Sequence, residues 1–245
     1  MKAVLFGASK GMGRAVARLM AERGDRLFLL GRDLEDLQRS ARDLEIRGAA
    51  GTVGTAACDL LEPHTFSPAL DQAAAALDGF DTIVVTAGLF ATQEQLEDDR
   101  ELTARLLTAD FTNTVLFCEE ARTRLLVNGG GTLCVFSSVA GERGRKPVIL
   151  YGAAKAGLSH YLEGLDHKFR AQGLKTIAVK PGFVKTSMTA GLQPPPFAAE
   201  PDDAARAVLK AIDRGQPEVY ATGIWRWIIL VIRALPRVVM RRIAF

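Results

Sequence analysis

Apolar residues recur along the chain in short uninterrupted runs, separated by longer segments with helical spacing. The runs cover residues 3–6, 27–30, 53–57, 83–85, 133–136, 177–179 and 218–220. Runs this continuous are typical of strands covered on both faces, as in a parallel sheet. One intervening segment, 33–47, has its apolar residues on one helical face: Leu34, Leu37, Ala41 and Leu44. The alternation predicts an α/β fold, a Rossmann-type doubly wound three-layer sandwich with a seven-stranded parallel sheet.

Polar and glycine-rich motifs directly follow six of these runs. In chain order they are "GASKGMG", "GRD", "CDL", "TAG", "SSVAG" and "PGFVKT". Ligands of doubly wound sheets bind at the carboxyl ends of the strands, so six such motifs on one rim predict a binding site.

The first two motifs predict a dinucleotide. Gly7, Gly11 and Gly13 follow a strand and open a helix, where glycine lets a diphosphate approach backbone N–H groups, although such turns also arise from packing. The second strand of a dinucleotide fold ends on an acid for NAD or a cation for the 2′-phosphate of NADP. Here Arg32 can bind that phosphate and Lys10 can add a second charge. The motifs favour NADP(H), with NAD(H) as the alternative cofactor and two solvated side chains as the alternative interpretation.

Three residues of the later motifs suit acid–base chemistry. Tyr151 and Lys155 are four residues apart and share a helical face, while Ser138 ends the fifth strand. A free tyrosine has a pKa of about 10. Lys155 favours the phenolate and should lower that pKa, so Tyr151 can exchange a proton with a substrate oxygen held by Ser138. The alternative is a surface tyrosine and lysine beside a strand-end serine.

Taken together, these motifs resemble the short-chain dehydrogenase/reductase superfamily from residue 1 to about residue 220. The resemblance is carried by "GASKGMG", "CDL", "TAG", Ser138 with "YGAAK", and "PGFVKT". It implies an NAD(P)(H)-dependent ketoreductase or alcohol dehydrogenase that acts as a homodimer or homotetramer. In it, Tyr151 is the acid/base, Ser138 positions the carbonyl or alcohol, and Lys155 binds the nicotinamide ribose.

The resemblance also implies the cofactor contacts. Asp59 and Leu60 are expected at the adenine, Gly88 along the cofactor, and Val184 and Thr186 at the carboxamide. No metal site is expected. The cofactor-binding residues expected in all are Gly7, Ser9, Lys10, Gly11, Met12, Gly13, Arg32, Asp59, Leu60, Ala87, Gly88, Tyr151, Lys155, Pro181, Gly182, Val184 and Thr186.

Two positions depart from the family pattern. Thr86 replaces the second Asn of "NNAG", a change expected to affect strand support. Asp110 stands where the family has a catalytic Asn that holds a water behind the lysine. Its charge should stabilise protonated Lys155 and oppose the phenolate. Asn113 is the alternative if the motif is aligned one turn later. These departures motivate a second hypothesis, a nucleotide-binding pseudoenzyme or scaffold.

The remainder of the chain bears on domains and location. The length suits one catalytic domain, 1–221, with a substrate loop near 187–200 expected to act as a lid in which Gln193 and Phe197 line the pocket. The N-terminus lacks a secretion signal, which predicts a cytoplasmic protein. Three cysteines in apolar runs, Cys58, Cys118 and Cys134, are expected in the core.

Residues 222–245 form a basic tail with five arginines and no acid, whereas the preceding part carries 26 basic and 28 acidic residues. This distribution argues against a nucleic-acid partner for the domain. The apolar stretch 227–232 is too short to span a bilayer. Spacing predicts an amphipathic helix, bent at Pro236, with Arg226, Arg233, Arg237 and Arg241 opposite Trp225, Ile228, Ile229, Ile232 and Leu235.

The predicted tail suits a helix lying on the inner face of a membrane. Packing on the chain's own pocket, on a second subunit or on a flavoprotein is the alternative. The motifs "SSVAGERGRK", "PGFVKTSM" and "LPRVVMRR" are similar to the ketoreductase subunits of decaprenylphosphoryl-ribose 2-epimerases. That likeness implies a lipid-linked keto-sugar substrate and an NADH preference, the second of which Lys10 and Arg32 oppose.

Overall fold

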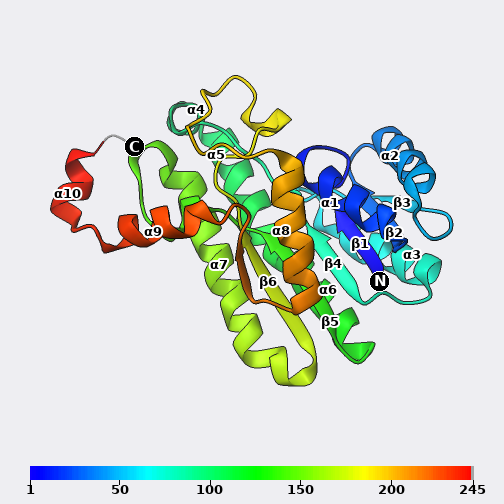
Figure 1. Ribbon diagram of the computed structural model, residues 1–245. Coiled ribbons are helices and arrows are strands. Elements are labelled where there is room, and N and C mark those ends of the chain that lie inside the picture. The colour runs from blue at the N-terminus through cyan, green and yellow to red at the C-terminus, as the bar shows by residue number, and fades with distance from the viewer. Residues whose placement is uncertain (244–245) are drawn as a thin grey trace.

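Seven parallel strands form one sheet at the centre of the protein, in a computed structural model that describes residues 1–243 (Figure 1). The strand order is β3-β2-β1-β4-β5-β6-β7, which confirms the predicted doubly wound fold. The strands are β1 Lys2–Phe6, β2 Arg26–Gly31, β3 Gly54–Ala57, β4 Thr82–Val85, β5 Gly131–Phe136, β6 Leu174–Lys180 and β7 Glu218–Tyr220.

Helices cover both faces of the sheet. The helices are α1 Gly11–Glu22, α2 Leu34–Arg47, α3 Phe66–Leu77, α4 Gln93–Asp98, α5 Arg100–Leu107, α6 Thr114–Val127, α7 Ile149–Phe169, α8 Pro201–Arg214, α9 Ile224–Ala234 and α10 Arg237–Arg242. One core contains side chains of α1, α2 and α8, and the other contains those of α3, α6 and α7. The structure therefore has the three layers that the alternating pattern predicts.

Each apolar run supplies both cores because successive side chains of a strand point to opposite faces. In β1, Ala3 and Leu5 enter the core beside α1 and α8, while Val4 and Phe6 enter the other. Cys58, Cys118 and Cys134 are buried and unpaired, as predicted, and burial raises the pKa of the Cys58 thiol to about 12.

Two local expectations were wrong. Val53 does not belong to β3, because its backbone N–H donates to the side chain of Glu45 at 2.8 Å rather than to a neighbouring strand. Leu34 is 43% exposed, while Leu37, Ala41 and Leu44 on the predicted face of α2 are buried. Leu34 is the first residue of the helix, directly after the N-cap Asp33, and lies beyond the part of the face that reaches the core.

The C-terminal helices α9 and α10 project beyond the α/β domain on the side of α7 (Figure 1). The chain turns at Leu235 and Pro236, so the bend predicted at Pro236 is confirmed. Arg233 of α9 forms an ion pair with Glu142, whose other oxygen binds Lys180 of β6, and this network ties α9 to the sheet. None of the described helices is both long and apolar enough to cross a membrane.

Candidate functional site

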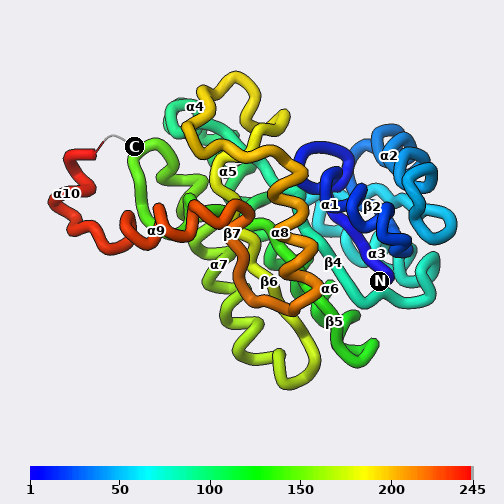
Figure 2. Tube along the Cα trace, viewed as in Figure 1, coloured from blue at the N-terminus to red at the C-terminus, as the bar shows by residue number. Residues whose placement is uncertain are grey.

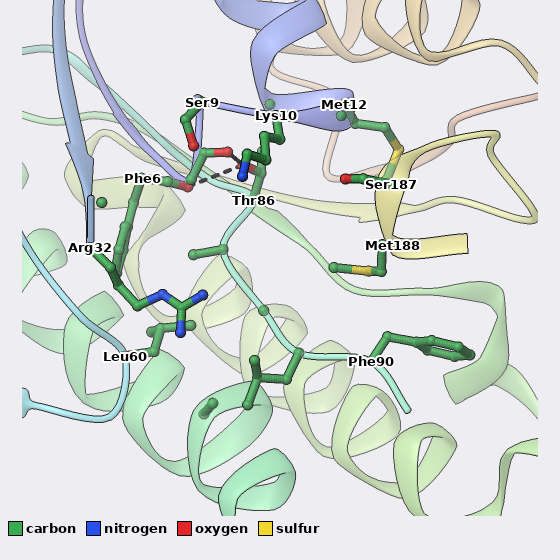
Figure 3. Close-up of a pocket in the computed structure, with 18 of the residues that line it drawn as sticks. Phe6, Ser9, Lys10, Met12, Arg32, Leu60, Thr86, Phe90, Ser187 and Met188 are labelled. Atoms are coloured by element: carbon green, nitrogen blue, oxygen red, sulfur yellow. Dashed lines mark hydrogen bonds between the residues drawn. The ribbon is translucent and has the colours of Figure 1, made fainter. Parts of the chain in front are cut away.

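A cavity lies over the carboxyl ends of β1, β2 and β4, where the strand order reverses between β1 and β4. Such a switch point is where doubly wound sheets bind ligands. Twelve of the expected cofactor-binding residues line the cavity: Gly7, Ser9, Lys10, Gly11, Met12, Gly13, Arg32, Asp59, Leu60, Ala87, Gly88 and Thr186. Arg32 and Leu60 lie toward one end, and Phe90, Ser187 and Met188 toward the other (Figure 3).

Thr86 supports the glycine loop from the neighbouring strand end. Its hydroxyl lies 3.1 Å from the carbonyl oxygen of Phe6 and 3.0 Å from that of Gly7 (Figure 3). A Cβ at Gly13 would lie only 2.3 Å from the Thr86 hydroxyl, so glycine is needed for this close approach. Gly7 has φ of +95° and allows the turn that leads into α1. Thr86 therefore has a supporting role, as the sequence indicates.

The opposite wall of the cavity is held in place by Asn113 and Asp59. Asn113 is buried, and its side-chain amide donates to the carbonyl oxygen of Leu60 at 2.6 Å. Asp59 accepts from the backbone N–H of Leu61 at 2.9 Å. Because Asn113 is engaged with Leu60, it does not substitute for Asp110 beside Lys155, and that alternative was wrong.

Lys10 and Arg32 both line the cavity but have different surroundings. Lys10 is largely exposed and forms an ion pair with Asp36 at 3.4 Å. Arg32 extends beside Leu60 and forms no salt bridge within residues 1–243 (Figure 3). Asp33 accepts the backbone N–H of Asp36 at 3.0 Å and thereby caps α2. Arg32 is thus the cation with its charge available to a ligand at this end.

The catalytic candidates lie beside the cavity rather than in its wall. Tyr151 packs edge-on against Phe90, with ring centroids 5.2 Å apart, and Phe90 lines the cavity. The Lys155 ammonium lies 5.6 Å from the Tyr151 ring centroid. A Cβ on Gly88, which lines the cavity, would lie 3.6 Å from that ammonium. The structure therefore brings Tyr151 and Lys155 to the end of the cavity marked by Phe90.

Asp110 is fully buried and forms an ion pair with Lys155. Its Oδ2 lies 3.2 Å from the Lys155 Nζ, and its Oδ1 accepts the backbone N–H of Leu89 at 2.6 Å. Asp110 belongs to a π-helical turn, Thr108–Asn113, a local distortion often found at functional sites. The carboxylate therefore lies directly behind the lysine.

The buried pair changes the expected pKa of Tyr151. Burial and the Asp110 charge raise this pKa above 10, although Lys155 and the Ser138 hydroxyl oppose the change. Asp110 also raises the pKa of Lys155 despite burial, and burial raises the pKa of Asp110 itself. The expectation that Lys155 would lower the pKa of Tyr151 therefore holds for that single interaction but not for the side chain as the structure surrounds it.

Two positioning residues near Tyr151 were missed from the sequence. Gln93 of α4 accepts the backbone N–H groups of Ile149 and Leu150 at 2.8 and 3.2 Å, so it caps the start of α7. Ser137 bonds the Lys155 carbonyl at 2.9 Å and the Ser159 hydroxyl at 2.7 Å. The only sequence signal for a role of Ser137 was its position next to Ser138. No sequence signal indicated a role for Gln93.

Ser138 and the segment after β6 complete this end of the site. The hydroxyl of Ser138 accepts the backbone N–H of Ala140 at 3.1 Å, and the side chain is 9% exposed. Pro181, Gly182 and Val184 lie outside the cavity wall, whereas Thr186 belongs to it.

The substrate loop contributes different residues from those expected. Ser187 and Met188 line the cavity, and Gln193 and Phe197 do not. Phe197 is 47% exposed, because the segment turns outward before its backbone returns to pair with residues 183–185. A lid role for residues 187–200 remains a prediction.

The Asp110→Asn variant should shift the pH profile of turnover toward lower pH. Removing the negative charge removes a contribution that raises the pKa of Tyr151, and an asparagine can still accept the Leu89 N–H. The phenolate then forms at a lower pH than in the wild type. As the pH is raised, alcohol oxidation therefore gains activity, and carbonyl reduction loses activity, at a lower pH than in the wild type. The profile of kcat/KM against pH measures this shift. Asp166→Asn, on the same helix as Tyr151, is the control, and an alkaline shift would contradict the assignment.

The site fits a nicotinamide dinucleotide. The glycine loop brings backbone N–H groups to the start of α1, where a diphosphate is favoured. Asp59, Leu60 and Arg32 line one end of the same cavity, and Gly88 leads toward Lys155 at the other. A ligand of extended shape can therefore contact all of these residues.

Comparisons with known proteins agree with this arrangement. A model of the short chain dehydrogenase family matches residues 1–196. An uncharacterized oxidoreductase of Mycobacterium tuberculosis is 30% identical over 98% of this chain and 95% of its own length. Carbonyl reductase family member 4 of Danio rerio is 30% identical, with 78% of each chain covered. A short-chain type dehydrogenase/reductase from Mycobacterium marinum has the same fold, with a TM-score of 0.83, 23% identity and coverage of 91% and 94% of the two chains. The protein thus belongs to the short-chain dehydrogenase/reductase family of oxidoreductases.

Proposed function

We propose that the protein is an NADP(H)-preferring ketoreductase or alcohol dehydrogenase. The observation that carries the proposal is the position of Tyr151 and Lys155, one turn apart on α7, at the end of a cavity that fits a dinucleotide. The name carbonyl reductase on one relative supports the same reaction class. When bound, the nicotinamide supplies or accepts a hydride.

The chain's own residues handle the proton. Tyr151 donates its phenolic proton to the carbonyl oxygen during reduction and takes it back during alcohol oxidation. Ser138 hydrogen-bonds that oxygen and fixes its orientation. Lys155 stabilises the phenolate left on Tyr151, while Asp110 holds Lys155 in its protonated state. Since Asp110 opposes the phenolate, Tyr151 stays protonated in the absence of substrate and becomes a weaker acid than it would be beside Lys155 alone.

Replacing Arg32 with alanine should weaken NADPH binding about 10- to 100-fold and leave NADH binding nearly unchanged, since a charge-assisted hydrogen bond contributes roughly 1.5–3 kcal/mol. Fluorescence of bound dihydronicotinamide measures both affinities. Arg42→Ala, on the exposed side of α2, is the control. Equal loss for the two cofactors, or none, would contradict the NADP(H) preference.

A panel of carbonyl compounds tests the reaction itself. Purified protein with NADPH should reduce at least one of a set of ketones, keto-sugars and lipid-linked ketones, observed as loss of dihydronicotinamide absorbance.

The proposal also includes a lipid-linked substrate and assembly as a homodimer or homotetramer. Preference for a polyprenyl-linked keto-sugar over its soluble counterpart would support the lipid-linked class, and the reverse preference would exclude it.

The second candidate function is a nucleotide-binding scaffold without turnover. Asp110 favours it, because a buried carboxylate beside Lys155 opposes the phenolate. Thr86 does not favour the scaffold hypothesis, because its hydroxyl supports the glycine loop. Tight cofactor binding with no turnover across the panel, in the wild type and in Asp110→Asn, would favour the scaffold.

A further inference from the structure

The C-terminal arm, residues 222–243, has two apolar faces, only one of which the domain covers. On the covered face, Ile229 and Ile232 of α9 are buried against Val139. Away from this contact, the arm exposes Ile224, Trp227, Leu230 and Val231 of α9 and Val238 and Val239 of α10, whose exposed fractions lie between 39% and 66%. These six side chains are hereafter called the exposed apolar face. Figure 2 shows the arm projecting beyond the domain, and the exposed fractions show that the described chain covers these six side chains only in part.

A basic groove lies between the arm and the loop before α7. It is lined by Arg143, Arg145 and Lys146 of the loop and by Arg237 and Arg241 of α10, together with Gly144, Ile149 and Met240. Two hydrogen bonds join its walls, because Arg143 donates to the carbonyl oxygen of Leu235 at 2.9 Å and Lys146 to that of Arg241 at 2.8 Å. Arg143 and Lys146 thus donate to neutral main-chain acceptors, which leave their charges unbalanced.

The charge of this groove is not balanced within the described chain. Over residues 1–243, none of its five cations forms a salt bridge, whereas Arg233 nearby is paired with Glu142 at 3.1 Å. The Nε of Arg145 is buried without a hydrogen-bond partner, and burial lowers the pKa of this guanidinium. The single basic stripe predicted from the sequence was therefore wrong. Arg233 binds the domain, and Arg237 and Arg241 turn with α10 to join cations of another segment.

We propose that the arm binds the surface of a bilayer that contains anionic phospholipids. The exposed apolar face would enter the boundary between headgroups and acyl chains, and the groove would bind lipid phosphates. A second copy of the chain is a poorer partner, since residues 222–245 contain no acid and a two-fold contact would bring like charges together. A soluble phosphate would balance the groove but would leave the apolar side chains exposed.

The position of the arm connects this surface to the site. Val139, which packs on α9, directly follows Ser138. The indole of Trp225 lies so close to Gly182 that a Cβ there would be 2.0 Å from the ring. The arm therefore packs, through its covered side, on the segments that follow β5 and β6. If the proposed function holds, a carbonyl carried on a membrane lipid would reach the site from this side.

Vesicle flotation tests the proposal on the full chain. The wild type should float with vesicles of phosphatidylcholine mixed with phosphatidylglycerol and should stay at the bottom with phosphatidylcholine alone. Each arginine near an anionic surface contributes about fivefold in binding. The double variant Arg237→Glu/Arg241→Glu should therefore lose at least tenfold, and high salt should release the wild type. The variant Trp227→Ser/Leu230→Ser should lose binding through the apolar face.

Matched controls make these changes elsewhere on the surface. Arg206→Glu/Lys210→Glu reverses two charges on exposed positions of α8, and Ile46→Ser/Val127→Ser removes two apolar side chains that are 87% and 81% exposed. Both controls should bind as the wild type does. All variants should retain the wild-type melting temperature and NADPH affinity, which shows that a loss of flotation does not come from unfolding.

Three results would overturn the proposal. The first is no flotation with either vesicle, and the second is equal flotation of the wild type and both arm variants. The third is a concentration-dependent dimer in sedimentation that the arm variants abolish without any vesicle binding, which would assign the surface to a second copy. Because flotation needs no turnover, its failure is distinguishable from failure of the carbonyl panel.

Discussion

Replacing Tyr151 with phenylalanine is expected to reduce kcat for carbonyl reduction by about 10²- to 10⁴-fold, the usual contribution of a general acid. The variant retains the aromatic ring and its edge-on contact with Phe90, so the fold and the cavity wall should persist. It loses the phenolic proton that the proposed mechanism transfers to the substrate oxygen. NADPH affinity should stay close to that of the wild type.

Single-turnover and steady-state rates, measured with NADPH and a substrate found in the panel, test this expectation. Tyr161→Phe is the matched control because it removes a hydroxyl from the same helix. The Tyr161 hydroxyl donates to Glu119 at 2.6 Å, and Tyr161 does not line the cavity. That variant should keep wild-type kcat. Full turnover by Tyr151→Phe would exclude tyrosine acid–base chemistry and with it the proposed mechanism.

The second large effect is expected from Lys155→Met, which should abolish measurable turnover and also lower stability. Lys155 is the ionic partner of Asp110, a carboxylate with no exposed surface. Removing one partner of a buried pair typically costs about 3–5 kcal/mol, because the remaining charge is uncompensated. For a chain of this size each kcal/mol corresponds to roughly 2–4 °C in Tm. Thermal unfolding in the presence and absence of NADPH measures the loss.

The pH dependence of this loss has a defined sign. Burial raises the pKa of Asp110, and without Lys155 an opposing interaction is lost, so the pKa rises further. A carboxyl whose pKa is higher in the folded than in the unfolded state destabilises the protein as pH rises above the unfolded value. The stability difference between Lys155→Met and the wild type should therefore shrink as the pH falls and Asp110 becomes protonated.

The double variant Lys155→Met/Asp110→Asn separates stability from catalysis. It removes both charges and should recover most of the stability, as expected when a buried pair is replaced by neutral groups. Turnover should remain absent, because Tyr151 still lacks the ammonium that stabilises its phenolate. Recovery of turnover in the double variant would show that Lys155 acts only by neutralising Asp110.

The sequence alone determined the architecture of this protein and the local motifs of its site. The apolar runs predict all seven strands because a strand covered on both faces needs apolar side chains at successive positions. The predicted ends of the strands differ from the observed ends by only a few residues. The glycine loop and the Tyr151–Lys155 pair are readable for a related reason. Their geometry depends on residues within one turn of each other, so spacing is sufficient.

Only the tertiary structure decided how these motifs are supported and charged. Gln93 caps a helix that begins 56 residues later, and Arg233 pairs with a glutamate 91 residues earlier. The direction in which the pKa of Tyr151 shifts depends on burial and on Asp110, and neither can be inferred from the spacing between Tyr151 and Lys155. Burial and charge pairing depend on distances in space between segments far apart in the chain, and a one-dimensional pattern records only the neighbours within an element.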